Sequence, residues 1–142
     1  MRTRETIIKL HRFKADEARR KLTMLEGMKA DLERKSGELE RTVAEEQRRA
    51  IEDEIGRFAY PGFARSVVTR RENLSKSLGE IERQIATVRE ELNEAYRELK
   101  KFEAIEENRQ REAQAARAQD EQAEADDITL TRFAGRSAES RT

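Results

Sequence analysis

Cysteine and tryptophan are absent from this chain of 142 residues, and proline occurs only once. Without cysteine the chain cannot form disulfides or thiolate metal sites, which is compatible with a cytosolic protein. Apolar residues make up 35% of the chain and aromatic residues 5%, which is too little for a thick, multilayered core. Because one proline and six glycines leave long stretches uninterrupted, the composition favours helix.

An excess of charge of either sign is also lacking, since 30 basic and 30 acidic residues cancel. A general nucleic-acid-binding protein usually carries a net basic face, so we expect no nucleic-acid partner. No apolar run approaches the roughly 18 residues that suggest a membrane span. The N-terminus lacks the apolar run of a signal peptide. We therefore expect a cytoplasmic protein that does not insert into a membrane.

Two long stretches repeat apolar residues at alternating spacings of three and four. Such heptads give a helix a narrow apolar seam that must supercoil against a partner helix. The two seams predict an all-α, stalk-like protein in which two long helices form an antiparallel coiled-coil hairpin. The seam residues are Ile8, Ala15, Ala18, Leu22, Leu25, Leu32, Leu39, Val43 and Ala50 in the first stretch, and Val67, Leu74, Leu78, Ile81, Ile85, Val88, Leu92, Ala95, Leu99 and Phe102 in the second.

Glycine and proline indicate where the chain reverses. Gly56 suits the end of a helix, and Pro61 suits the first turn of the next one. Near the C-terminus the heptads end, and Ile128, Leu130 and Phe133 suggest a short docking element in an otherwise flexible tail. The predicted segments are a first helix over residues 1–55, an aromatic turn over 56–60, a second helix over 61–125 and a flexible tail over 126–142.

Facing residues in an antiparallel pair have a constant sum of residue numbers. This sum describes the register of the hairpin, and half of it gives the position of the turn. A sum of 117 aligns the seam positions throughout and places Glu46 opposite Arg71. A sum of 124 leaves Glu46 facing Leu78, and a buried charge needs a partner. We therefore predict the sum of 117, with the ammonium of Lys29 extending outward from the seam. Since the hairpin satisfies its own seam, we expect a monomer in isolation.

Catalytic constellations are missing from the sequence. His11 is the only histidine, and neither a glycine-rich phosphate loop nor a nucleophile elbow occurs. A lone histidine among many carboxylates is weak evidence for a metal site. We therefore expect no enzymatic activity, and no residue is assigned a catalytic, cofactor-binding or metal-binding role.

Three of the seven aromatic residues gather near the predicted turn, namely Phe58, Tyr60 and Phe63. Aromatic side chains offer large, rigid contact areas and are enriched at interface hot spots. Two interpretations stay open. The rings either bind a partner, or they fold over the tip as a cap that seals Val67 and Ala50.

Other apolar residues lie off the seam, although a rod needs only its seam to be apolar. They either form a docking surface at the open end of the hairpin or widen the seam locally. These residues are Ile7, Leu10, Phe13 and Ile105 near the open end, and Met24 and Met28 further along.

Four strings resemble the FliJ family of flagellar type III export proteins, in its alphaproteobacterial form. They are MRTRETIIKLHRFKADEARR over residues 1–20, FAYPGFAR over 58–65, RRENL over 70–74 and EAYRELKKFE over 94–103. The resemblance implies a two-helix coiled coil like the central stalk of rotary ATPases. It implies three partners: the export ATPase hexamer, the cytoplasmic domain of the export gate protein, and export chaperones. It also implies peripheral association with the export apparatus of the inner membrane.

The resemblance carries over to named positions at both ends of the hairpin. By position, Tyr60, Phe63 and Val67 fall on the gate-contacting surface, and the aromatic cluster adds Phe58. The family's gate contacts on the first helix have no match within residues 43–55. The residues at the ATPase-facing end are Ile7, Ile8, Leu10, Phe13, Phe102 and Ile105.

Two further functions compete with the export stalk. A general structural or tethering coiled coil would self-associate through its arms and form dimers. A chaperone would hold unfolded export cargo on the outer face that bears Met24 and Met28, and this function could coexist with the stalk.

Overall fold

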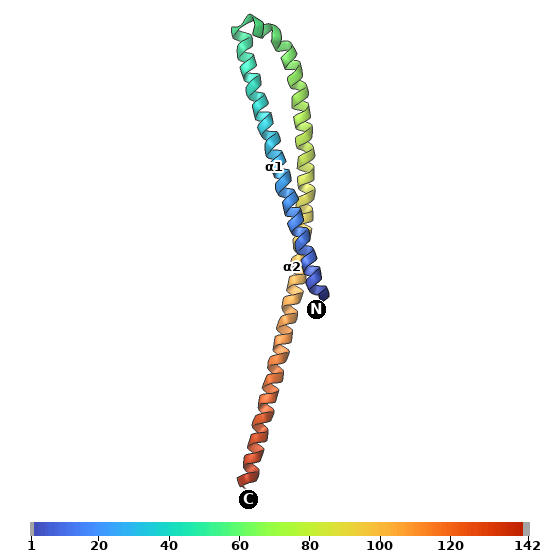
Figure 1. The fold of residues 1–142 in the computed structure, drawn as a ribbon, viewed down its shortest axis with the longest axis vertical. Helices are drawn as coiled ribbons and strands as arrows, with labels where there is room; N and C mark the ends of the chain where they lie inside the picture. Colours follow the sequence, from blue (N-terminus) through green and yellow to red (C-terminus); the bar gives the residue numbers. More distant parts are fainter. Residues whose placement is uncertain (1, 141–142) are drawn as a thin grey trace. The chain divides into compact units, whose positions relative to one another are not determined.

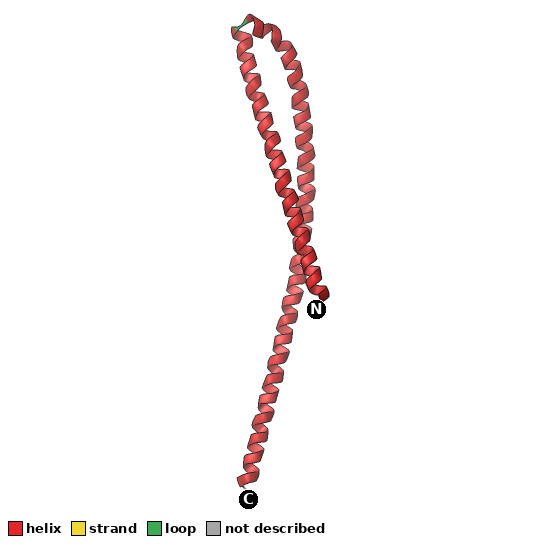
Figure 2. Ribbon diagram, in the orientation of Figure 1, coloured by secondary structure: helices red, strands yellow, loops and turns green. Residues whose placement is uncertain are grey.

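Nearly the whole chain is helical. The computed structural model describes residues 2–140, with side chains for residues 3–136. Helix α1 spans Arg2–Glu52 and helix α2 spans Glu54–Ser140. No strand occurs within this described range, so the predicted all-α class with two long helices is confirmed (Figure 2). By its contacts the chain divides into a hairpin unit, Lys9–Arg97, and a terminal unit, Met1–Ile8 with Glu98–Thr142.

In the hairpin unit, α1 and the first part of α2 run antiparallel and join at a tip (Figure 1). Every buried apolar residue of this unit lies on one of the two predicted seams, which confirms the heptad assignment. The buried residues form two clusters. The central cluster contains Ala18, Leu25, Ile81, Ile85 and Val88, and the tip cluster contains Leu39, Val43 and Val67.

The chain reverses at Asp53, not at the predicted turn over residues 56–60. Asp53 is the one described residue between α1 and α2. Its carboxylate Oδ1 accepts a hydrogen bond from the backbone N–H of Ile55 at 3.3 Å, which is the contact of a helix N-cap. Its own N–H donates to the carbonyl of Arg49 at 2.9 Å, and its carbonyl accepts from Arg57 at 3.0 Å. Asp53 therefore ends α1 and starts α2 at once.

Gly56 permits this abrupt reversal by its lack of a side chain. The sequence predicted a helix-ending glycine, but Gly56 lies inside α2 and no described glycine has a positive φ. A Cβ atom built on Gly56 would lie 2.5 Å from the carbonyl oxygen of Arg49. The first turn of α2 can therefore approach the last turn of α1 only because residue 56 is glycine.

Pro61 bends α2 instead of starting it. It lies about two turns inside the helix, where its missing N–H leaves the carbonyl of Arg57 without a helical donor. Such a proline commonly kinks a helix, and α2 curves over the tip in its first turns (green in Figure 1). The bend brings α2 back against α1.

The observed register differs from the predicted sum of 117. Residue numbers sum to 111 for the contacts Glu40–Arg71 and Lys29–Glu82, and to 115 for Glu26–Arg89. Moving the turn to Asp53 lowers the sum, so the arms are displaced relative to the predicted register. The predicted pairing of Glu46 with Arg71 is wrong, whereas Lys29 does extend its ammonium outward, to within 3.8 Å of Glu82.

The terminal unit contains little buried surface. Leu99 is buried in it, whereas every residue over 110–136 is exposed. The predicted flexible tail over residues 126–142 is helical as far as Ser140, and residues 141 and 142 lie outside the described range. The preceding alanines, glutamates and glutamines are strong helix formers, and an existing helix propagates cheaply through such residues.

Candidate interaction surfaces

Two aromatic rings at the tip are engaged within the hairpin. The hydroxyl of Tyr60 accepts a hydrogen bond from the amide Nε2 of Gln47 at 3.2 Å. The ring of Tyr60 lies 6.3 Å, centre to centre, from that of Phe63, and the planes are tilted by 47°. Phe63 packs against the tip cluster. Both rings are half-buried, so they already cover the end of the core.

The other two residues assigned to the gate surface differ sharply in exposure. Val67 is only 3% exposed and belongs to the tip cluster. It supports Phe63 from within the seam and offers almost no area to a partner. Phe58 is 90% exposed. Contact with the gate at this surface stays a prediction, and Phe58 is the residue that presents most area for it.

Two isoleucines at the tip, which the sequence pattern did not single out, are strongly exposed. Ile51 is 81% exposed and Ile55 is 77% exposed. They flank the acidic residues 52–54 in the string IEDEI. The sequence carried a signal for a helix start here, since aspartate is a preferred N-cap residue. With Asp53 as the cap, both isoleucines fall at the tip and off the seam.

The six residues assigned to the ATPase-facing end divide between the two units. In the terminal unit Ile7, Ile8 and Phe102 are half-buried, and Ile105 is 46% exposed. The ammonium of Lys101 lies 5.7 Å from the ring centre of Phe102, within the range of a cation–π contact. In the hairpin unit Leu10 and Phe13 are both exposed. Binding of the ATPase by these residues stays a prediction.

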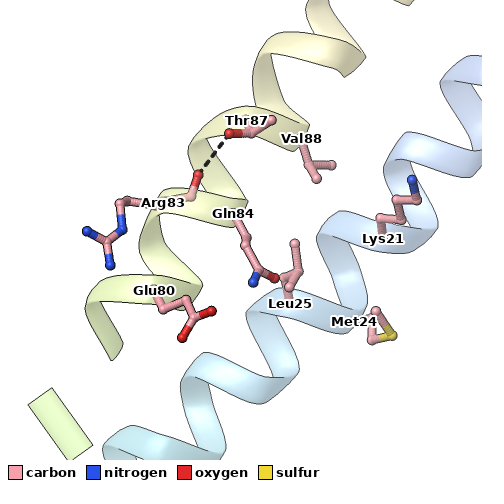
Figure 3. Close-up of a pocket in the computed structure, with 8 residues that line it drawn as sticks. All are labelled: Lys21, Met24, Leu25, Glu80, Arg83, Gln84, Thr87 and Val88. Carbon is pink, nitrogen blue, oxygen red and sulfur yellow. Dashed lines mark hydrogen bonds between the residues drawn. The ribbon is translucent and has the colours of Figure 1, made fainter. Parts of the chain in front are cut away.

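An open groove of about 590 Å³ runs between the arms of the hairpin unit beside the central cluster (Figure 3). Leu25 and Val88 contribute apolar surface to it, and Met24 lies at its edge, largely exposed. A second groove, lined in part by Met28, adjoins the first. The remaining residues that line the first groove are Lys21, Glu80, Arg83, Gln84 and Thr87.

The strongest ion pair between the arms joins Glu40 and Arg71. Arg71 donates from Nε and Nη2 to the two carboxylate oxygens, and both distances are 2.7 Å. This bidentate geometry is the favourable one for arginine and a carboxylate. The hydrogen bonds from Arg71 hold the pKa of the Glu40 carboxyl below its ordinary value of 4.5. Glu46, in contrast, contacts Arg49 on its own helix at 3.4 Å.

We expect the substitution Glu40→Gln to lower the melting temperature of the chain more at pH 7 than at pH 3. A depressed pKa in the folded state stabilises the fold above the unfolded-state pKa. This contribution is lost as the pH falls through the folded-state pKa, because the carboxyl is then protonated. Circular dichroism melts at both pH values test the expectation. Glu26→Gln is the matched control, since Glu26 makes one longer contact, 3.7 Å, to Arg89. An equal effect of Glu40→Gln at both pH values would contradict the assignment.

Within the described residues, no group of three histidine, aspartate or glutamate side chains is placed to hold a metal ion. None of the helices in the described part of the chain is both long enough and apolar enough to cross a lipid bilayer.

Comparison with known proteins decides the family. The family model described as flagellar FliJ protein matches residues 3–138, nearly the whole chain. The chain belongs to the FliJ family. No curated protein and no solved structure matches it. As a FliJ-family member it is a coiled-coil protein of flagellum biogenesis and flagellar protein export. Its alphaproteobacterial subtype stays a prediction.

Proposed function

We propose that this FliJ-family protein is a non-catalytic stalk that links the export ATPase hexamer to the cytoplasmic domain of the export gate protein. The family match over residues 3–138 is the observation that carries the proposal. In this proposal the stalk works in the cytoplasm, peripherally associated with the export apparatus of the inner membrane, and assists export chaperones.

The distribution of apolar side chains supports the assignment of one partner to each end. At the tip, Phe58 is exposed while the rings of Tyr60 and Phe63 cover the tip cluster. Far from the tip along the chain, Phe13 and Ile105 are exposed. Exposed apolar residues that gather into a contiguous patch commonly mark interaction sites. In the proposal the tip contacts the gate and the open end contacts the ATPase.

A bridging experiment tests this function. The export ATPase is immobilised, and the cytoplasmic domain of the gate protein is added with or without the full chain. We expect the gate domain to be retained only when the chain is present, because the chain supplies both contacts. Retention that does not depend on the chain, or no retention at all, would overturn the proposal.

Light scattering on the free chain serves as the control. We expect a monomer of 16.6 kDa, because the hairpin covers its own seam. A dimer in the absence of partners would favour the self-associating, tethering alternative.

A further inference from the structure

The seam of the hairpin unit is interrupted between its two apolar clusters. On α1, Leu32 packs against the central cluster, and Leu39 is the next residue along the seam that belongs to the tip cluster. On α2 the corresponding residues are Ile81 and Leu74. The stretches in between belong to neither cluster, and together we call them the middle layer. They are residues 33–38 of α1 and residues 75–80 of α2.

The middle layer contains little apolar packing. On α1 its seam position is occupied by Ser36, which is half-buried. On α2 its one apolar residue is Leu78, which is also only half-buried. Within the described chain, no buried side chain of this layer joins the central cluster to the tip cluster. The two clusters are therefore connected by backbone and polar side chains alone.

Each arm has one glycine in the middle layer, Gly37 on α1 and Gly79 on α2. Nothing lies within 4 Å of a Cβ atom built on either residue, so packing does not require glycine at these positions. Glycine in a helix interior is less stable than alanine, because its backbone has more freedom to lose. Gly37 also follows Ser36, and pairs of glycine and serine are common positions of helix kinks. Both arms are therefore soft in this layer.

The geometry of a hairpin makes the coincidence of the two glycines important. The tip is joined to the central cluster by two helices, so a soft position in one arm cannot let the tip change direction while the other arm stays rigid. Both arms must yield at the same level. Two ion pairs between the arms enclose both glycines and so place them at one level. These pairs are Lys29–Glu82 and Glu40–Arg71.

Gly27 on α1 provides the contrast. Nothing lies within 4 Å of a Cβ atom built on it either. The ion pairs between the arms on either side of Gly27 enclose residues 82–89 of α2, a stretch without glycine. This stretch contributes Ile85 and Val88 to the central cluster. At the level of Gly27 the opposite arm is therefore braced, and one soft position does not make a joint.

We propose that the middle layer is a joint at which α1 and α2 yield together, so that the tip segment, residues 39–74, pivots relative to the central cluster. The inference goes beyond the stalk function and does not depend on it, because it concerns the chain alone. In a stalk held at both ends, the joint lets the tip segment change direction while the open end keeps its contact.

Limited digestion of the full chain with trypsin tests the joint. Trypsin cleaves after lysine and arginine where a helix opens locally, and the middle layer offers it one exposed lysine on each arm, Lys35 and Lys76. When opening and closing are faster than cleavage, the cleavage rate follows the population of the open state. Within residues 9–97 we expect cleavage after both lysines to precede cleavage after Lys21 and Arg83, which are equally exposed but lie beside the central cluster.

Substitutions of single glycines by alanine separate a joint from two independent soft positions. Gly37→Ala changes α1 alone, yet we expect it to slow cleavage after Lys76 on α2 as well as after Lys35, each roughly fivefold. This factor corresponds to the preference of alanine over glycine for a helix, about 1 kcal/mol. Gly79→Ala is expected to slow both cleavages from the other arm. Gly27→Ala is the matched control, with the same substitution on the same helix, and we expect it to leave both rates unchanged.

Three results would overturn the inference. If Gly37→Ala slows cleavage after Lys35 but not after Lys76, the arms yield independently and there is no joint. If Gly27→Ala slows both cleavages as much as Gly37→Ala does, cleavage follows unfolding of the whole hairpin. If Lys21 and Arg83 are cleaved as early as the two lysines in the unaltered chain, the middle layer is no softer than the central cluster.

Discussion

Replacing Ile85 by aspartate is expected to destabilise the hairpin by more than about 4 kcal/mol, the range reached when a charge is buried without a partner. Ile85 is 5% exposed and belongs to the central cluster, which both arms build. A carboxylate there must either lose its hydration or force the arms apart. Since whole domains are stable by only about 5–15 kcal/mol, the change should remove much of the fold at room temperature.

Urea unfolding followed by circular dichroism measures this effect. Gln84→Asp is the matched control, because it introduces the same side chain one residue earlier at an exposed position. We expect the control to lose less than about 1 kcal/mol, mainly through the lower helix propensity of aspartate. Similar unfolding midpoints for the two variants would mean that the arms do not pack at Ile85.

Alanine is expected to act in opposite directions at two glycines. Gly56→Ala should lower the free energy of unfolding by about 1–3 kcal/mol, the usual cost of forcing an atom into a packed site. The added Cβ would lie 2.5 Å from a backbone oxygen, that of Arg49, which cannot move aside as a side chain can. Gly37→Ala should raise the free energy of unfolding by up to about 1 kcal/mol, because alanine is the better helix former and nothing lies within 4 Å of the new Cβ.

Both glycine variants can be compared with the unaltered chain in one series of urea titrations. The opposite signs are the informative result, since helix propensity alone would stabilise both variants. If Gly56→Ala also stabilised the chain, the close approach between the two helices at the tip would be refuted.

The seam was predictable because heptad spacing is a local property of the sequence. Residues such as Leu25 and Ile85 are apolar at the right interval, and both are buried. The register was not predictable in this way. Shifting one arm by seven residues again pairs seam with seam, so the heptads fit several registers equally well. Only the position of the turn decides among them.

The turn was misplaced because Gly56 and Pro61 were given their commonest roles. Glycine often ends a helix, but Gly56 is needed for a close contact that only the folded hairpin creates. The sum of 117 was preferred to the larger sum of 124 on the assumption that Glu46 needs a partner on the other arm. Its side chain is 26% exposed and reaches Arg49 on its own helix, so that assumption was wrong.

The misplaced turn also affected the prediction of the candidate site. The aromatic cluster at the tip was visible in the sequence, and Phe58 is indeed exposed. Whether Ile51 and Ile55 face solvent depends on where α1 ends, so their exposure could be recognised only once Asp53 was known to cap α2. Tyr60 and Phe63 are held within the hairpin, whereas Phe58 is exposed. This difference likewise could be recognised only from the contacts of the folded tip.

The long exposed stretch of α2 affects how thermal melts of this protein should be interpreted. Over residues 110–136 no side chain is buried, so this helix depends on local propensity alone. Such a helix frays progressively on heating, whereas a packed hairpin melts in one cooperative step. Ellipticity will therefore decline gradually before the main transition. A two-state fit to the whole signal would then understate the enthalpy of hairpin unfolding, and a probe placed in the seam would report it directly.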